Sequence, residues 1–135
     1  MKIVLDTNCL LPAIFPRSMY HWVWENFRRA TYTLCYTNEI IAEYEELISR
    51  LYPPEITENT MHLILNSQNV EEIIPHFKWN FISADPDDNK FVDCALNAGA
   101  DYIVTNDKHF NILKPLDFPP IKIIDIESFK NVLML

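Results

Sequence analysis

Short apolar runs alternate with amphipathic stretches along the chain. The runs rich in β-branched and aromatic residues predict buried strands at residues 3–5, 32–36, 70–74, 102–104 and 121–124. The stretches with apolar residues at helical spacing predict helices at residues 19–30, 38–51, 58–66, 87–98 and 128–133. Strands and helices in alternation favour a three-layer α/β architecture around a parallel sheet.

Local signals place the ends of these elements. Thr37 or Asn38 is a suitable N-cap for the helix that follows. Gly99, the single glycine of the chain, predicts the end of the helix before it. With one glycine, the chain lacks the Gly-rich phosphate-binding loops of Rossmann and P-loop proteins. The segment that carries Pro12 and Pro16, and residues 76–84, are predicted to be loops.

The size and composition of the chain predict one domain over residues 1–135. Of the 135 residues 49% are apolar, enough for a hydrophobic core, and no apolar window is long enough to predict a membrane span. Cys9, Cys35 and Cys94 are too scattered for a zinc site or a disulfide framework. We therefore expect core thiols and a reducing cytoplasm.

The charge of the chain is strongly acidic. Eleven Lys and Arg against nineteen Asp and Glu give a formal net charge of −8. Nucleic-acid binders usually contact phosphates through Lys and Arg, so this balance is unusual for that class. It suits a protein that holds metal cations or meets a basic partner.

Two acids follow predicted strands directly. Asp6 comes after residues 3–5, and Asp107 comes shortly after residues 102–104. In open parallel sheets ligands collect beyond the carboxyl ends of the strands, so the pair favours a site. The alternative is that each acid caps the helix that follows, which is the commoner role for a single such Asp.

Helical-wheel positions sort the other acids. In the helix after Pro86, Asp88 projects within about 30° of the centre of the apolar stripe, while Asp93 points nearly opposite and is expected in solvent. The alternative role for Asp88 is placement at the positive end of the helix. In the helix at 38–51, Glu43 and Glu45 flank the apolar stripe on opposite sides, and the wheel does not choose between them.

Four motifs, in this order along the chain, resemble those of the PIN domain family. They are Ile3-Val4-Leu5-Asp6-Thr7-Asn8, Thr37-Asn38-Glu39-Ile40-Ile41-Ala42-Glu43-Tyr44, Asp88-x-x-Phe91 with Ala95 and Gly99-Ala100-Asp101, and Val104-Thr105-Asn106-Asp107. The resemblance spans essentially the whole chain and implies a PIN-like three-layer α/β/α sandwich with a central parallel sheet. More narrowly, the chain resembles the toxin components of bacterial toxin–antitoxin systems.

The resemblance implies a metal-dependent ribonuclease that cuts single-stranded RNA. Its catalytic and metal-binding acids, carried over by position, are Asp6, Glu43, Asp88 and Asp107. The resemblance thus selects Glu43 over Glu45. It also gives supporting roles to Asn8 and Thr105, and it implies a homodimer and a cognate basic antitoxin as protein partner.

Hard cations such as Mg²⁺ and Mn²⁺ prefer oxygen ligands, so one or two of these ions suit four carboxylates from separate elements. For RNA phosphates, the candidate contacts are Arg17, Lys90 and Lys108, which neighbour the motifs. Trp22 is the kind of side chain that stacks on bases, but its helical spacing favours a place in the core.

Other functions compete with this hypothesis. An aspartyl-phosphate phosphatase needs a second Asp two residues after the nucleophile, and position 8 is Asn. A catalytically idle PIN-like module that only binds a partner agrees with the acidic charge, whereas the four retained acids oppose it. A PIN nuclease of RNA processing or decay, rather than a toxin, remains an alternative biological role.

Overall fold

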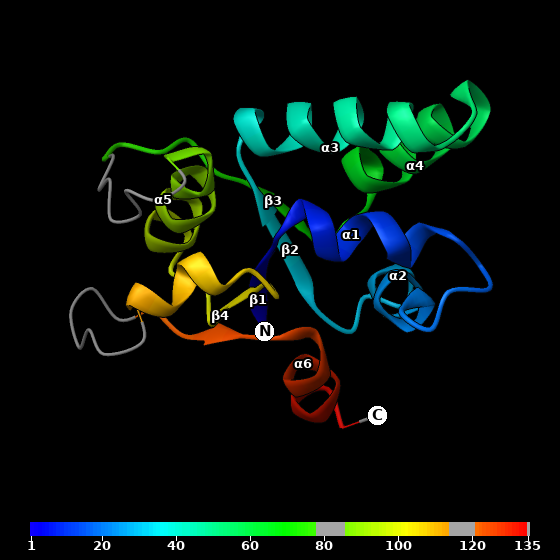
Figure 1. Ribbon diagram of the computed structural model, residues 1–135. Helices are drawn as coiled ribbons and strands as arrows, with labels where there is room; N and C mark the ends of the chain where they lie inside the picture. Colours follow the sequence, from blue (N-terminus) through cyan, green and yellow to red (C-terminus); the bar gives the residue numbers. More distant parts are fainter. Residues whose placement is uncertain (78–85, 114–120, 135) are drawn as a thin grey trace.

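A computed structural model describes residues 1–77, 86–113 and 121–134 (Figure 1). Its centre is a five-stranded sheet in which every strand pair is parallel, in the order β3-β2-β1-β4-β5. The strands are β1 (Lys2–Leu5), β2 (Thr33–Tyr36), β3 (Val70–Glu72), β4 (Tyr102–Val104) and β5 (Ile123–Ile124). All five predicted strands are thus confirmed, with β3 and β5 shorter than expected.

Within the described residues, six α-helices accompany the sheet. They are α1 (Thr7–Ile14), α2 (His21–Arg28), α3 (Asn38–Leu51), α4 (Pro54–Asn66), α5 (Asn89–Ala98) and α6 (Ile126–Val132). Two 3₁₀ segments, η1 (Pro86–Asp88) and η2 (Lys108–Leu113), lie before α5 and after β4. Helix α5 lies on one side of the sheet and α1 and α2 on the other, so the predicted α/β sandwich is confirmed (Figure 1).

The strand order reverses direction between β1 and β4. Strands β2 and β3 extend the sheet on one side of β1, and β4 and β5 extend it on the other. The register pairs Leu5 with Val104, so β1 and β4 end level with each other. Such a switch point opens a crevice outside the carboxyl ends of the two strands, which is where open α/β sheets bind ligands.

Helix α1 corrects the prediction of a loop after residue 6. Pro12 lies inside α1, where it cannot donate a hydrogen bond to the carbonyl four residues earlier. The helix forms nevertheless because Leu10, Ala13 and Ile14, at helical spacing, are buried in the core. Helix α4 also begins four residues before the predicted Glu58, because Pro54 in its first turn is compatible with a helix.

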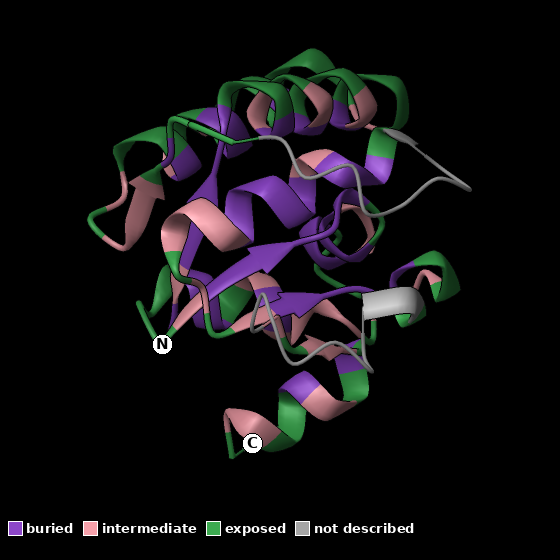
Figure 2. Ribbon diagram, turned by 90° about the vertical axis from the view of Figure 1, so that its left-hand side faces the viewer, coloured by how far each residue is buried: buried purple, intermediate pink, exposed green. Residues whose placement is uncertain are grey.

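A core of apolar side chains binds the sheet to its helices, and Figure 2 shows the buried residues concentrated on the central strands and the helices against them. The three cysteines are free and buried, as predicted. Trp22 packs against Phe129 of α6 with ring centroids 5.8 Å apart, which agrees with its core interpretation. In the described part of the chain, no helix has both the length and the apolar character that crossing a bilayer requires.

Gly99 ends α5 in the left-handed conformation, with φ of +64°. A Cβ at this position would meet nothing within 4 Å, so backbone conformation alone disfavours a side chain. We expect Gly99→Ala to lower the free energy of unfolding by about 1 kcal/mol, measured by urea denaturation. Gly99→Asn should lose less, because Asn tolerates this conformation better than Ala does. Equal stability of the wild type and Gly99→Ala would contradict this expectation.

Candidate active site

The candidate site lies at the switch point, beyond the carboxyl ends of β1 and β4. Asp6 follows β1, and its backbone N–H donates to the carbonyl of Val104 at 3.0 Å. Thr105 and Asp107 follow β4 on the same edge of the sheet. The two strand ends therefore bring together acids that are 101 residues apart in the sequence.

Thr105 links the two strand-end acids. Its hydroxyl donates to Oδ2 of Asp6 at 2.7 Å, and Oγ1 of Thr105 itself accepts the backbone N–H of Asp107 at 3.0 Å. Thr105 is buried, and its contact with Asp6 is shielded from water. The residue thus fixes Asp6 and the start of the Asp107 turn relative to each other, which is a supporting position like the one the sequence suggested.

Asp6 is 4% exposed and lies near other acids. Burial raises its pKa, and the negative charges of Asp107 and Glu43 add to that effect. Hydrogen bonds from Thr105 and from the Asn8 backbone amide act in the opposite direction but do not cancel the rise. Asn8 therefore contacts Asp6 through its main chain, while its side chain is exposed.

For Asp107, the effects that lower the carboxyl pKa outweigh the effect that raises it. Burial alone raises the pKa of its carboxyl group, but the net pKa is lowered by the His109 backbone N–H, by a hydrogen bond with Asp88 and by the charge of His109. The His109 N–H donates to Oδ1 of Asp107 at 2.9 Å. Asp107 is thus the acid of this site whose ionised form the protein favours.

Asp88, Asp107 and His109 form a compact cluster of potential metal ligands. One ligand atom from each lies within 4.8 Å of the other two. Nδ1 of His109 lies 3.4 Å from Oδ1 of Asp107 and 3.7 Å from Oδ2 of Asp88. Asp88 is buried at the end of η1, immediately before α5, and it faces a site formed by a different part of the chain. Two carboxylates and an imidazole from two segments, the end of η1 and residues 107–109, converge here.

Glu43 reaches the site from α3. Its Oε2 accepts a hydrogen bond from the Thr7 hydroxyl, and its Oε1 lies 2.9 Å from Nζ of Lys90. The next residue, Tyr44, anchors this turn of α3 because its buried hydroxyl donates to the carbonyl of Leu5. Glu45 is exposed. The structure therefore brings Glu43, rather than Glu45, to the strand-end acids.

Asp93 corrects the helical-wheel prediction. We expected it in solvent, yet it is 6% exposed. The helical-wheel prediction assumed that the face of α5 opposite the sheet is exposed to solvent. The chain after β3 instead crosses that face. Asn97, one turn after Asp93, accepts the backbone N–H of His76 at 3.1 Å and donates to the carbonyl of Phe77 at 3.4 Å. Asp93 is therefore not a solvent-exposed acid, and substituting it is unsuitable as a control for substitutions of the site acids.

The three basic residues proposed for RNA contacts lie in different surroundings. Arg17 is exposed beyond the far end of α1, about 12 Å of helix away from Asp6. Lys90 is 13% exposed and its ammonium is engaged by Glu43. Lys108 is exposed and lines a pocket of about 250 Å³ together with Asp107 and Asn111. Lys108 is therefore the exposed basic residue best placed to contact RNA beside Asp107.

Sequence reasoning missed two residues of this site. Thr7 holds Glu43, and His109 completes the cluster with Asp88 and Asp107. Thr7 stands beside Asp6 in the first motif, so that motif contained the available signal. His109 had no such signal, because a single His two residues after an Asp lacks the paired spacing that marks His ligands. Only the fold of η2 shows that His109 lies beside Asp88 and Asp107.

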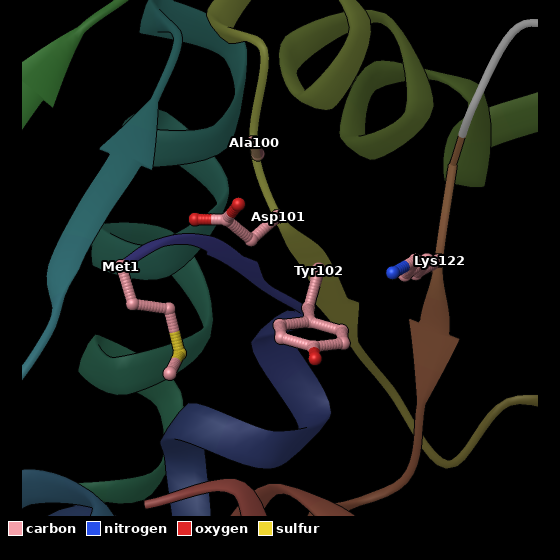
Figure 3. A pocket seen from close by; sticks show the side chains of 5 residues that line it. All are labelled: Met1, Ala100, Asp101, Tyr102 and Lys122. Atoms are coloured by element: carbon pink, nitrogen blue, oxygen red, sulfur yellow. The ribbon is translucent and has the colours of Figure 1, made fainter.

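A second pocket lies at the opposite edge of the sheet. It has a volume of about 420 Å³ and is lined by residues that precede or begin strands, Met1, Asp101, Tyr102 and Lys122 among them (Figure 3). One Asp101 carboxylate oxygen accepts the backbone N–H of Lys2 at 2.9 Å, which ties that acid to the strand edge. Since open parallel sheets bind ligands at the carboxyl edge, size alone does not make this pocket the active site.

A family model described as PIN domain matches residues 2–109, a stretch that contains all four predicted acids. The chain belongs to the PIN domain family. Comparison with curated proteins finds no match.

Solved structures share the fold of this PIN domain. VapBC2 from Rickettsia felis, bound to a DNA fragment from its promoter, aligns with a TM-score of 0.60 and 19% identity. FitAcB from Neisseria gonorrhoeae aligns with a TM-score of 0.55 and 13% identity. Each alignment covers 93% of this chain and 98% of the other.

The donor set of this PIN domain fits a divalent cation. Carboxylate oxygens are the ligands that Mg²⁺ and Mn²⁺ prefer, and an imidazole nitrogen is acceptable to Mn²⁺. One ligand atom each from Asp88, Asp107 and His109 lies within 4.8 Å of the other two, so one cation could be held by all three residues. The residues at the switch point are therefore chemically suited to the metal that the family implies.

Proposed function

We propose that this PIN domain is a divalent-metal-dependent endoribonuclease that hydrolyses phosphodiester bonds of single-stranded RNA. The observation that carries the proposal is the convergence of Asp88, Asp107 and His109 at the switch point of a PIN fold. Asp6 and Glu43 lie next to this cluster and complete the acids that the sequence suggested as catalytic and metal-binding. We assign Mg²⁺ or Mn²⁺ as the cofactor.

Asp6, Asp88 and Asp107 would hold the cation, and Glu43 completes the acidic site beside them. When bound, a divalent cation polarises a phosphoryl oxygen and lowers the pKa of a coordinated water molecule. The protein's own contribution is to keep the acids in place before the substrate arrives. Thr105 holds Asp6 and the Asp107 turn, and Thr7 holds Glu43, so little reorganisation is needed on binding.

The RNA would approach the site from the open carboxyl edge of the sheet. Lys108 lines the pocket beside Asp107, where its ammonium can meet a phosphate next to the scissile bond. Arg17 remains a proposed contact for a more distant phosphate. With a net charge of −8, the protein must bring RNA to an acidic surface, and bound cations reduce this repulsion.

The test is cleavage of a labelled single-stranded RNA in three matched reactions: with Mn²⁺, with Mg²⁺ and with EDTA. We expect cleavage with metal and none with EDTA. Cleavage that continues in EDTA would contradict the metal requirement. A lack of cleavage under all conditions, by a protein that is folded and binds Mn²⁺, would favour the idle module that acts through a partner.

We also propose that the protein is the toxin of a toxin–antitoxin pair and forms a homodimer. The sequence resemblance to toxin components and the shared fold with VapBC2 and FitAcB support this role. An acidic toxin suits a basic antitoxin, because opposite charges speed their association.

Induced expression in bacteria should stop growth, and the product of an adjacent gene should restore it. Light scattering after size exclusion should give twice the 15.9 kDa chain mass. Unimpaired growth would favour a role in RNA processing or decay.

A further inference from the structure

Lys90 is a built-in cation inside the acidic site. Its ammonium lies 2.9 Å from Oε1 of Glu43 and donates to the carbonyl of Asp87 at 2.7 Å. The ring of Phe91 lies below it, with the centroid 5.3 Å from Nζ. The Lys90 side chain is 13% exposed, whereas that of Lys2, in its ion pair with Glu71, is 43% exposed. Three groups therefore hold this positive charge at one place.

Both oxygens of Glu43 are engaged by the protein itself. Thr7 donates to Oε2, and Lys90 pairs with Oε1. By contrast, the compact cluster of ligand atoms among the described residues contains Asp88, Asp107 and His109, and does not contain Glu43. The site is thus divided into a side suited to a metal ion and a side where an ammonium already neutralises the carboxylate.

Two-metal nucleases place their ions about 4 Å apart, so that positive charge lies on both sides of the reacting phosphate. We propose that Lys90 takes the place of the second ion, so that this site binds a single divalent cation on the side of Asp88 and Asp107. The inference rests on the proposed metal-dependent function and settles its metal count. Lys90 is then a positioning residue for Glu43 and a fixed source of positive charge, rather than a mobile contact for RNA.

The charge of Lys90 should control whether a second divalent ion binds. A divalent ion next to Glu43 would meet the ammonium of Lys90 at close range, and that like-charge contact disfavours a second ion. Removing the ammonium would leave a partly buried carboxylate near the charge of Asp6, which is a strong reason to take up a cation. Lysine substitution should therefore change the number of bound ions, whereas a purely structural lysine would change stability alone.

The test counts bound Mn²⁺ by equilibrium dialysis with metal analysis and by electron paramagnetic resonance of the free ion. We expect about one Mn²⁺ per chain for the wild type and for Lys90→Arg, and about two for Lys90→Met. The double variant Lys90→Met/Glu43→Gln should return to one, because the vacated carboxylate is gone. Lys108→Met is the matched control: it removes an exposed lysine beside Asp107 and should leave the count at one.

Two Mn²⁺ ions on the wild type would overturn the proposal, and so would a count of one on folded Lys90→Met. The wild-type count decides the matter even if Lys90→Met does not fold. A wild type that binds no Mn²⁺ would instead refute the proposed metal-dependent function itself. The two failures are thus distinguishable in one measurement.

Discussion

Asp107→Asn is expected to lower Mn²⁺-dependent RNA cleavage by more than about 100-fold. Removing a residue that only supports a metal ligand typically costs 10- to 100-fold, so loss of a ligand itself should cost more. Asp107 is the acid whose ionised form is favoured, and its carboxylate lies in the cluster with Asp88 and His109. Asp88→Asn should have an effect of similar size, because it removes another charge of the same cluster.

Glu45→Gln is the matched control for these variants. It also neutralises one acid, on the same helix as Glu43, but its side chain is exposed. We expect its cleavage rate to stay within about threefold of the wild type, as surface substitutions usually change little. Circular dichroism and thermal melts establish that each variant is folded. If Asp107→Asn cleaves RNA as fast as Glu45→Gln does, the assignment of the site is wrong.

The Asp6→Asn variant is expected to melt higher than the wild type in EDTA at neutral pH. The substitution keeps the shape of the side chain, retains an oxygen for the Thr105 hydroxyl and removes the repulsion from Asp107 and Glu43. A gain on the order of 1 kcal/mol corresponds to a shift of roughly 3 to 4 °C for a chain of this length. The measurement is a pair of thermal melts in EDTA and in millimolar Mn²⁺.

The pH dependence of this difference has a definite sign. Burial raises the pKa of Asp6 above its usual 3.8 in the folded protein, so the folded state binds the proton more tightly than the unfolded state does. Below that usual value Asp6 is protonated in both states and does not reduce stability. As pH rises through the pKa of the folded state, the loss of stability caused by the buried Asp6 charge becomes complete. The melting advantage of Asp6→Asn should therefore grow from pH 4 to pH 7.

Asp107 acts in the opposite direction in the wild type. Its pKa is lowered in the folded state, so it contributes stability above its usual pKa and loses that contribution as pH falls through the lowered value. Because Asp6→Asn retains Asp107, this effect is common to both proteins and largely cancels in their difference. The comparison at each pH thus isolates the carboxyl group of Asp6.

Mn²⁺ should reduce or reverse the difference in melting temperature between Asp6→Asn and the wild type. A ligand that binds only the folded state stabilises it by RT ln(1 + [L]/Kd), about 2.7 kcal/mol at one hundred times Kd. The wild type should gain more than Asp6→Asn, which has lost one ligand. A lower melting temperature for Asp6→Asn in EDTA, together with equal responses to Mn²⁺, would identify Asp6 as a structural cap of α1.

The fold was predictable where periodicity and caps agreed. The apolar runs gave the five strands, and the stripe of α3 together with Gly99 gave two helices close to their observed bounds. Helix α1 was missed because Pro12 and Pro16 suggested a loop, whereas burial of Leu10 and Ile14 outweighs the hydrogen bond that Pro12 cannot make. Tertiary burial, which local signals do not contain, decided that segment.

The candidate site was predictable only as a set of separate residues. Wheel positions and strand ends indicated Asp6, Asp88 and Asp107, and the family resemblance added Glu43. Distances between elements lay beyond such reasoning, so the Lys90–Glu43 ion pair could not be foreseen. The wheel also misplaced Asp93, because it had no information on the chain segment that covers the outer face of α5.

Anomalous X-ray diffraction from crystals soaked in Mn²⁺ locates the bound metal ion without relying on activity. We expect a manganese peak at the switch point, within coordination distance of the carboxylates of Asp88 and Asp107 and absent from Asp107→Asn crystals. RNA cleavage in solution by a protein whose manganese peak lies elsewhere, or whose crystals show none, would contradict this assignment of the metal site.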